Sequence, residues 1–251
     1  MGLFIGKGID LINMDISKKP VILITGATSG IGFALARKLL INDYRVGLCG
    51  RSEQKMDALM KEITGVPQAQ YEARIFDLLD EGARMQFIHD CEEKFQVIDV
   101  LINCAGANTA RGKVVEIHQQ DLEYMIHLNT IAPLRMMQEV AKGMQNRKSG
   151  LIINVLSSAC LYSNENLGAY TASKMAFDAL TKIARKELRQ DRIRVCAIYP
   201  GGVNTTFRAT PRPDYLSPES VADAIFDVIK SPPDVGVDEI VLRPLVETNL
   251  P

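Results

Sequence analysis

The chain has 251 residues, with 29 Lys and Arg against 30 Asp and Glu, and the formal net charge of −1 excludes a protein that binds nucleic acid through a basic surface. Hydrophobic residues make up 47% of the chain and charged residues 24%, which is ordinary for a globular protein and excludes collagen-like or disordered chains. Since no apolar run is long enough to cross a bilayer, we expect no membrane partner and a cytoplasmic location.

Cysteines and histidines are few and scattered, with five Cys and three His. Their spacing fits neither a disulfide framework nor a zinc site, so we expect reduced thiols and no metal. Lys7 and Asp10 interrupt the apolar start of the chain before a signal peptide can form. We expect residues 1–19 to form an N-terminal extension and residues 20–251 to form a single domain.

From residue 21 onward, short apolar runs alternate with stretches of helical spacing. Strand-like runs cover residues 21–25, 44–49, 71–76, 97–102, 151–156, 193–198 and 239–242. Helical stretches cover residues 31–40, 52–63, 80–95, 170–188 and 217–229, with two more inside 118–144. This alternation predicts an α/β fold, a single doubly wound Rossmann-type domain whose parallel sheet of about seven strands has helices on both faces. In such folds ligands bind beyond the carboxyl ends of the strands.

The first predicted strand ends in a glycine-rich turn that leads into a helix. Its sequence is Thr25-Gly26-Ala27-Thr28-Ser29-Gly30-Ile31-Gly32. Glycines let a diphosphate approach the unpaired N–H groups at the start of the helix. The turn therefore predicts a dinucleotide site, with an ordinary glycine turn as the alternative. The candidate residues are Gly26, Thr28, Ser29, Gly30, Ile31 and Gly32.

The second strand is followed by Gly50, Arg51 and Ser52, about where an acidic residue would bind the ribose 2′-hydroxyl of NAD. Arg51 predicts NADP(H) instead, because a guanidinium can bind the 2′-phosphate with two parallel hydrogen bonds, and Ser52 can add a weaker one. Two alternatives remain. Arg51 is a solvated surface residue in one, and in the other Glu53 accepts from the 2′-hydroxyl of NAD.

Small or polar residues follow the later strands. Asp77, followed by Leu78, can accept from an adenine amine or cap a helix. Asn103, Ala105 and Gly106 follow the fourth strand and let the chain pass close to a cofactor. The remaining candidates are Ser157 after the fifth strand and Pro200, Gly201, Val203 and Thr205 after the sixth.

Tyr170 and Lys174 lie four residues apart, and so on one face of their predicted helix. Together with Ser157, Asn129 and the glycine motifs, they resemble the classical short-chain dehydrogenase/reductase family from about Lys19 to the C-terminus. The matching patterns are Thr25-Gly26-x-x-x-Gly30-x-Gly32, Asn103-x-Ala105-Gly106, Asn129, Ser157, Tyr170-x-x-x-Lys174 and Pro200-Gly201-x-Val203-x-Thr205.

The resemblance implies an enzyme that interconverts a carbonyl and a secondary alcohol with NAD(H) or NADP(H). Arg51 favours NADP(H), with NAD(H) as a possibility. Asn129, Ser157, Tyr170 and Lys174 would be its catalytic residues, with Tyr170 as proton donor and acceptor. Lys174 would lower the pKa of Tyr170 and hold the cofactor ribose, while Ser157 would hydrogen-bond the substrate oxygen. The cofactor would supply the hydride.

The resemblance also implies that the backbone carbonyl of Asn129 holds a water linked to Lys174. Pro133 lies four residues later and has no N–H, which predicts a freed carbonyl and a helix kink at this point. The alternative is a tolerated kink without a catalytic role.

The resemblance also implies a homo-oligomer, a tetramer or dimer. We expect association through the helix over 170–188 and through the helix carrying Met136, Met137 and Met144. The loop 205–216, with Phe207, Arg208, Arg212 and Tyr215, is a candidate lid over a small, anionic substrate, or carries only solvated charges. Two other kinds of protein remain as alternatives: a nucleotide-binding sensor or regulatory protein, and a structural subunit without a cofactor.

Overall fold

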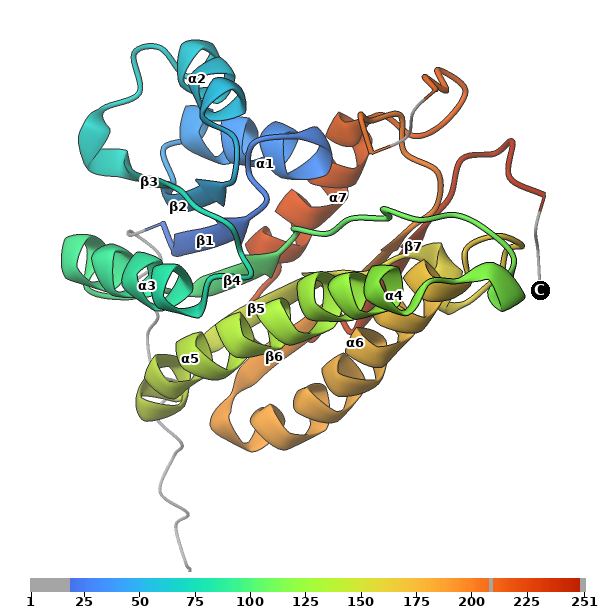
Figure 1. Ribbon diagram of the computed structural model, residues 1–251. Helices are drawn as coiled ribbons and strands as arrows, with labels where there is room; N and C mark the ends of the chain where they lie inside the picture. The colour runs from blue at the N-terminus through green and yellow to red at the C-terminus, as the bar shows by residue number, and fades with distance from the viewer. Residues whose placement is uncertain (1–18, 208–209, 249–251) are drawn as a thin grey trace, which may run out of the picture.

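The computed structural model describes residues 19–207 and 210–248, which form a parallel sheet of seven strands with helices on both faces (Figure 1). The strand order is β3-β2-β1-β4-β5-β6-β7. After β1, the next two strands are added outward on one side of it and the last four on the opposite side, so the order reverses between β1 and β4. The strands are β1 (Val21–Thr25), β2 (Arg45–Gly50), β3 (Tyr71–Ile75), β4 (Val100–Asn103), β5 (Gly150–Val155), β6 (Ile193–Pro200) and β7 (Glu239–Leu242). The expected doubly wound α/β fold is confirmed.

The helices of the described chain form two layers, one on each face of the sheet. One layer holds α1 (Gly30–Ile41), α2 (Glu53–Glu62) and α7 (Pro218–Lys230). The other holds α3 (Glu81–Phe95), α4 (Gln119–Ile126), α5 (Ala132–Arg147) and α6 (Gly168–Glu187). Short 3-10 turns at 68–70, 114–116, 158–160 and 188–191 were not predicted.

Each strand contributes to two hydrophobic cores because its side chains alternate between the two faces. In β1, Ile22 and Ile24 pack with α1 and α7, whereas Val21 and Leu23 pack with α3 and α5. All four side chains are at most 1% exposed. Continuous apolar runs are what a sheet covered on both faces requires.

Element boundaries differ from the sequence prediction by a few residues. The largest difference is in β4, which begins at Val100 rather than at residue 97. Residues 97–99 form the loop that leads into β4, and in it the Asp99 carboxylate accepts from the Val21 N–H at 2.8 Å. The expected extension over residues 1–19 lies outside the described residues, except for Lys19.

The methionines of α5, on which the expected association through this helix rests, are buried within the chain itself. Met136, Met137 and Met144 are 0%, 4% and 0% exposed and belong to the core between α5 and the sheet. Monomer folding alone therefore accounts for them.

Candidate functional site

A cleft of about 450 Å³ lies at the carboxyl ends of the strands and is lined by the loops that follow β1 to β6 and by Glu247 near the C-terminus. Because the strands are parallel, these loops meet at one edge of the sheet. The cleft brings together all predicted site residues except Gly32, Asn103 and Asn129. Those on the lining are Gly26, Thr28, Ser29, Gly30, Ile31, Arg51, Ser52, Asp77, Leu78, Ala105, Gly106, Ser157, Tyr170, Lys174, Pro200, Gly201, Val203 and Thr205.

The glycine-rich turn after β1 has the shape that its sequence predicts. Gly26 has φ of 71°, and a Cβ there would lie 2.8 Å from the Ala105 Cα, so only glycine fits between the two loops. Gly32 does not line the cleft. A Cβ on it would lie 2.2 Å from the Gly26 carbonyl oxygen, so it allows α1 to pack against the turn. Ser29 caps α1 without a side-chain bond to any described residue, which leaves the first N–H groups of α1 for an anion.

Two cations lie on the cleft lining after β2. Arg51 is exposed, and its Nη1 donates to the Tyr124 hydroxyl on α4 at 3.0 Å. Lys55, in the first turn of α2, also lines the cleft, whereas Glu53 does not. Sequence reasoning missed Lys55, although a second basic residue one turn after Arg51 was a readable signal. The Ser52 Oγ caps α2 by accepting from the Lys55 N–H at 3.4 Å, and the Asp77 carboxylate accepts from the Leu79 N–H at 2.9 Å.

Ser157, Tyr170 and Lys174 lie together at the other end of the cleft. Tyr170 is 8% exposed, and its ring lies edge-on to that of Phe207, with centroids 5.8 Å apart. The Ser157 Oγ accepts from the Ala159 N–H at 3.1 Å, so its hydroxyl hydrogen is available to donate. The arrangement offers two hydroxyls and an amine to one bound molecule.

Lys174 is 4% exposed, and its Nζ donates to the Val155 carbonyl at 3.0 Å. Burial lowers its pKa, because a charged amine loses its hydration there. The nearby thiols of Cys104 and Cys160 do not offset this. Burial raises the pKa of each to about 11, so both stay neutral at pH 7.

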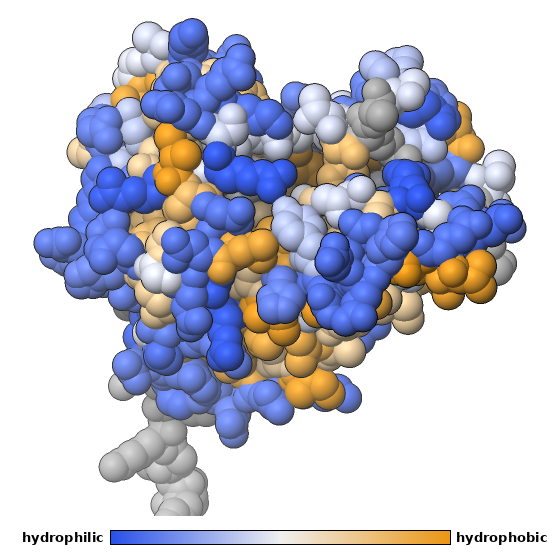
Figure 2. Space-filling model, in the orientation of Figure 1, coloured by the Kyte–Doolittle hydropathy of each residue, from blue (hydrophilic) through white to orange (hydrophobic). Residues whose placement is uncertain are grey.

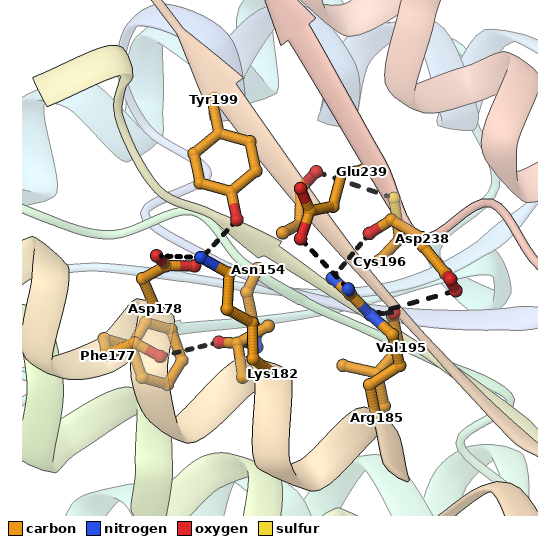
Figure 3. A network of polar contacts seen from close by, with 12 residues as sticks. Asn154, Phe177, Asp178, Lys182, Arg185, Val195, Cys196, Tyr199, Asp238 and Glu239 are labelled. Carbon is orange, nitrogen blue, oxygen red and sulfur yellow. Dashed lines mark hydrogen bonds and ion pairs between the residues drawn. The ribbon is translucent and has the colours of Figure 1, made fainter. Parts of the chain in front are cut away.

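The polar contacts beyond Lys174 do not supply it with a counter-charge either. Asp178, one turn further along α6, directs its carboxylate to the Tyr199 hydroxyl at 2.7 Å and to the Lys182 amine at 2.8 Å (Figure 3). Lys174 is thus a buried amine held by a neutral carbonyl, which is an arrangement suited to binding the hydroxyls of a ligand or exchanging a proton.

Asn129 is fully buried behind the cleft wall, in the π-helical turn His127–Ile131 between α4 and α5. Its side chain accepts from the Ala107 N–H at 2.9 Å and donates to the Ala107 carbonyl at 2.8 Å and to the Ser173 hydroxyl at 2.9 Å. Asn129 therefore fixes the loop after β4 against α6, and a π turn lies where a kink before Pro133 was predicted.

Asn103, predicted as a cofactor ligand, does not line the cleft. It is 2% exposed, and its amide donates to the Asn154 Oδ1 at 2.9 Å and to the Pro133 carbonyl at 3.3 Å. Asn154 donates in turn to Thr181 on α6 at 2.9 Å. Asn103 thus joins β4 to β5 and α5 inside the protein, because its side chain turns away from the end of its own strand.

Several residues of the cleft lining near Tyr170 were not predicted from the sequence. They are Asn108, Arg111, Asn164, Leu167, Thr206 and Glu247. The Glu247 carboxylate accepts from the Gly202 N–H at 2.7 Å, and Arg243 lies 3.4 Å from its other oxygen. No sequence motif marks these positions, since tertiary folding brings four distant segments together.

Of the loop 205–216, the candidate lid, Thr205, Thr206 and Phe207 line the cleft. Arg212 does not line the cleft, because it forms an ion pair with Asp214 at 2.7 Å and stacks 4.0 Å from the Tyr215 ring. Arg208 lies outside the described residues.

Across residues 19–207 and 210–248, no helix has the length and apolar character to span a membrane. The same residues contain no cluster of three or more His, Cys, Asp and Glu side chains able to hold a metal ion.

Comparison with known proteins gives consistent matches. The family model for short chain dehydrogenase matches residues 20–216. An uncharacterized oxidoreductase of Staphylococcus saprophyticus is 32% identical over 230 residues, which cover 90% of this chain and 97% of that protein. A 3α-hydroxysteroid dehydrogenase of Mediterraneibacter gnavus is 28% identical over 220 residues, which cover 87% of each. The crystal structure of a metagenomic short-chain oxidoreductase in complex with NADP matches with a TM-score of 0.79 at 29% identity, covering 92% of this chain and 99% of that one.

Proposed function

Because the chain belongs to the short-chain dehydrogenase family of oxidoreductases, we propose that it interconverts a carbonyl and a secondary alcohol with NADP(H), as a carbonyl reductase or alcohol dehydrogenase. One observation supports this most strongly. Ser157, Tyr170 and Lys174 line the same cleft as the glycine-rich turn and the Arg51–Lys55 pair. A proton donor and a dinucleotide site in one cleft are what carbonyl reduction needs.

The residues present fit a dinucleotide. The start of α1 and the turn at Gly26 and Gly30 would hold the diphosphate. Gly106 has no side chain next to Lys174. A Cβ on Gly106 would lie 3.1 Å from the Lys174 Nζ and 3.0 Å from the Asn129 Oδ1, so the glycine keeps this space open. This opening gives a bound ribose access to the Lys174 amine.

Arg51 and Lys55 support a preference for NADP(H) over NAD(H), since both place positive charge where the 2′-phosphate would bind. The hydrogen bond that Arg51 donates to the Tyr124 hydroxyl uses one Nη1 hydrogen and leaves the other donors of the guanidinium for the phosphate. Glu53, the candidate NAD ligand, is absent from the cleft lining, which counts against the alternative of an NAD-preferring dehydrogenase.

The proton chemistry follows from the side chains. Bound NADPH supplies the hydride. The Ser157 hydroxyl donates a hydrogen bond to the substrate oxygen, and Tyr170 donates the proton that this oxygen requires as it becomes a hydroxyl. The positive charge of the protonated Lys174 amine favours the phenolate that remains on Tyr170. Asn129 acts indirectly, by holding the loop after β4 through Ala107.

The proposal includes a cytoplasmic homo-oligomer, a tetramer or dimer. The five cysteines are unpaired, as expected where thiols are kept reduced. On α6, Met175, Leu180 and Ile183 are 48%, 36% and 51% exposed, and Figure 2 shows apolar side chains gathered over α5 and α6. This face would bury itself against a second copy of the chain.

The test is an assay of NADPH and NADH consumption with a panel of ketones, oxo acids and aldehydes, combined with a binding titration of each nucleotide. We expect NADPH binding and its oxidation by at least one class of carbonyl. NADPH binding without oxidation across the panel would favour the sensor, and the absence of nucleotide binding would favour the structural subunit.

A further inference from the structure

Arg111 is the cation that the proposed mechanism leaves unused at the substrate end of the cleft. It lies in the loop between β4 and α4 and lines the cleft with Asn108, Asn164 and Leu167. The other cations of the lining already have a role. Arg51 and Lys55 follow β2 and are assigned to the cofactor phosphate, and the buried Lys174 amine donates to the Val155 carbonyl. Arg111 therefore adds to the cleft lining a positive charge that the proposed mechanism does not use.

The backbone holds Arg111 next to the catalytic helix. Its neighbour Gly112 pairs with Leu167, the residue that caps α6, and donates from its N–H to the Asn166 carbonyl at 3.2 Å. Val114 also packs on the start of α6, since a Cβ on Gly168 would lie 3.1 Å from its Cγ2. Tyr170 is three residues beyond Leu167, so the position of Arg111 is fixed relative to the proton donor.

No acidic group neutralises Arg111 within the described part of the chain. Its guanidinium forms no hydrogen bond or ion pair with any residue in 19–207 or 210–248. Glu116, the acid nearest to it in sequence, and Glu165, beside the Asn166 that accepts from Gly112, are absent from the cleft lining. Glu247 does line the cleft, but its carboxylate is bound by the Gly202 N–H and by Arg243.

We propose that Arg111 binds a carboxylate of the substrate, so that the enzyme acts on oxo acids and hydroxy acids, an inference that rests on the proposed carbonyl reduction. A guanidinium presents two parallel N–H donors that match the two oxygens of a carboxylate, and it stays charged at all relevant pH. In the reduction, the carbonyl carbon gains a hydride as NADPH becomes NADP⁺. The carbonyl oxygen gains the Tyr170 proton, and the carboxylate is unchanged.

The experiment compares oxo acids of increasing chain length with their methyl esters as substrates, with NADPH at saturation. For at least one chain length, we expect kcat/KM of the acid to exceed that of its ester by about 10- to 100-fold. Arg111→Gln should abolish this difference by raising KM for the acid, with kcat/KM of the ester unchanged. Arg189→Gln, an exposed arginine at the far end of α6, is the matched control and should keep the preference.

A titration of the NADP⁺-saturated protein with the same acids gives a readout that needs no turnover. Acids should bind to the unmodified chain and to Arg189→Gln but at least about tenfold more weakly to Arg111→Gln. Equal binding by all three proteins would overturn the role of Arg111. Reduction of the esters at the same rate as the acids would overturn it too, while supporting the proposed function. Acid binding lost in Arg111→Gln, with no reduction of any acid or ester, would leave the carboxylate site standing and count against the proposed reaction.

Discussion

Lys174 is a charged side chain placed where charge is disfavoured. The unfolded chain exposes its amine to water, whereas the folded chain surrounds it with the Val155 carbonyl and neutral thiols. Its pKa is lowered by this burial, so folding costs free energy whenever the amine must stay protonated. A residue that only stabilised the fold would not be placed here.

This cost predicts a pH-dependent gain in stability for Lys174→Met. Between the lowered folded pKa and the unfolded value of about 10.4, the unfolded chain binds the proton and the folded chain does not. The free energy of unfolding of the unmodified protein therefore rises with pH in that window, and the cost is complete below it. Lys174→Met should be more stable than the unmodified protein near pH 7, and this difference in stability should shrink as pH approaches 10. Thermal unfolding without cofactor measures this, and a pH-independent difference would contradict the burial argument.

Arg51 determines cofactor choice in this proposal. Arg51→Ala should weaken NADPH binding by about 10- to 100-fold, because charge-assisted hydrogen bonds to the 2′-phosphate are lost, and should leave NADH binding nearly unchanged. The preference of the unmodified protein for NADPH should shrink as salt screens this exposed pair. Dissociation constants from titration measure both effects. An unmodified protein that prefers NADH would overturn the cofactor assignment.

The segment from α4 to α5 illustrates how far a local rule reaches. Pro133 lacks an N–H, and this fact alone predicts that the helix is disturbed near Asn129. The disturbance takes the form of the π turn His127–Ile131, which buries the Asn129 side chain against Ala107. The rule locates the irregularity, but it does not choose between a kink and a π turn, because that choice depends on packing against α6.

The contact between β6 and α6 depends on a buried pair of polar groups. Tyr199 is fully buried and donates to the Asp178 carboxylate, which Lys182 also contacts (Figure 3). Tyr199→Phe should lower the free energy of unfolding by about 1.5–3 kcal/mol, the value of a hydrogen bond to a charged group. Tyr71→Phe on β3, whose hydroxyl forms no hydrogen bond to a described residue, is the control in denaturant titrations. An equal, small effect of both changes would show that the pair contributes no stability.

Sequence patterns predict the order of the strands and helices because each is determined locally, by apolar periodicity, glycine and proline. They also predict the residues after each strand, since a parallel sheet brings those ends to one edge. They do not predict Arg111 or Glu247, which reach the cleft from loops whose paths depend on tertiary contacts such as the Glu247–Gly202 hydrogen bond. Nor do they predict that the Asn103 side chain joins an internal hydrogen-bond network with Asn154 instead of lining the cleft.

Assembly is expected to use the exposed apolar side chains of α6. Ile183→Glu should convert the oligomer to smaller species at micromolar concentration, because a charge would be buried in the interface. Ile41→Glu on α1 is a matched control, since Ile41 and Ile183 are both 51% exposed. Sedimentation velocity measures the outcome. A strict monomer before any substitution would refute the oligomer.

Proton transfer by Tyr170 is tested most directly by removing only its hydroxyl. Tyr170→Phe keeps the ring beside Phe207 and the cleft lining, so its NADPH dissociation constant should match that of the unmodified protein. Turnover with the best carbonyl substrate should fall by about 100-fold or more, the usual effect of losing a general acid. Tyr71→Phe should lose neither binding nor turnover. Near-normal turnover by Tyr170→Phe, with NADPH bound, would contradict the proposed mechanism.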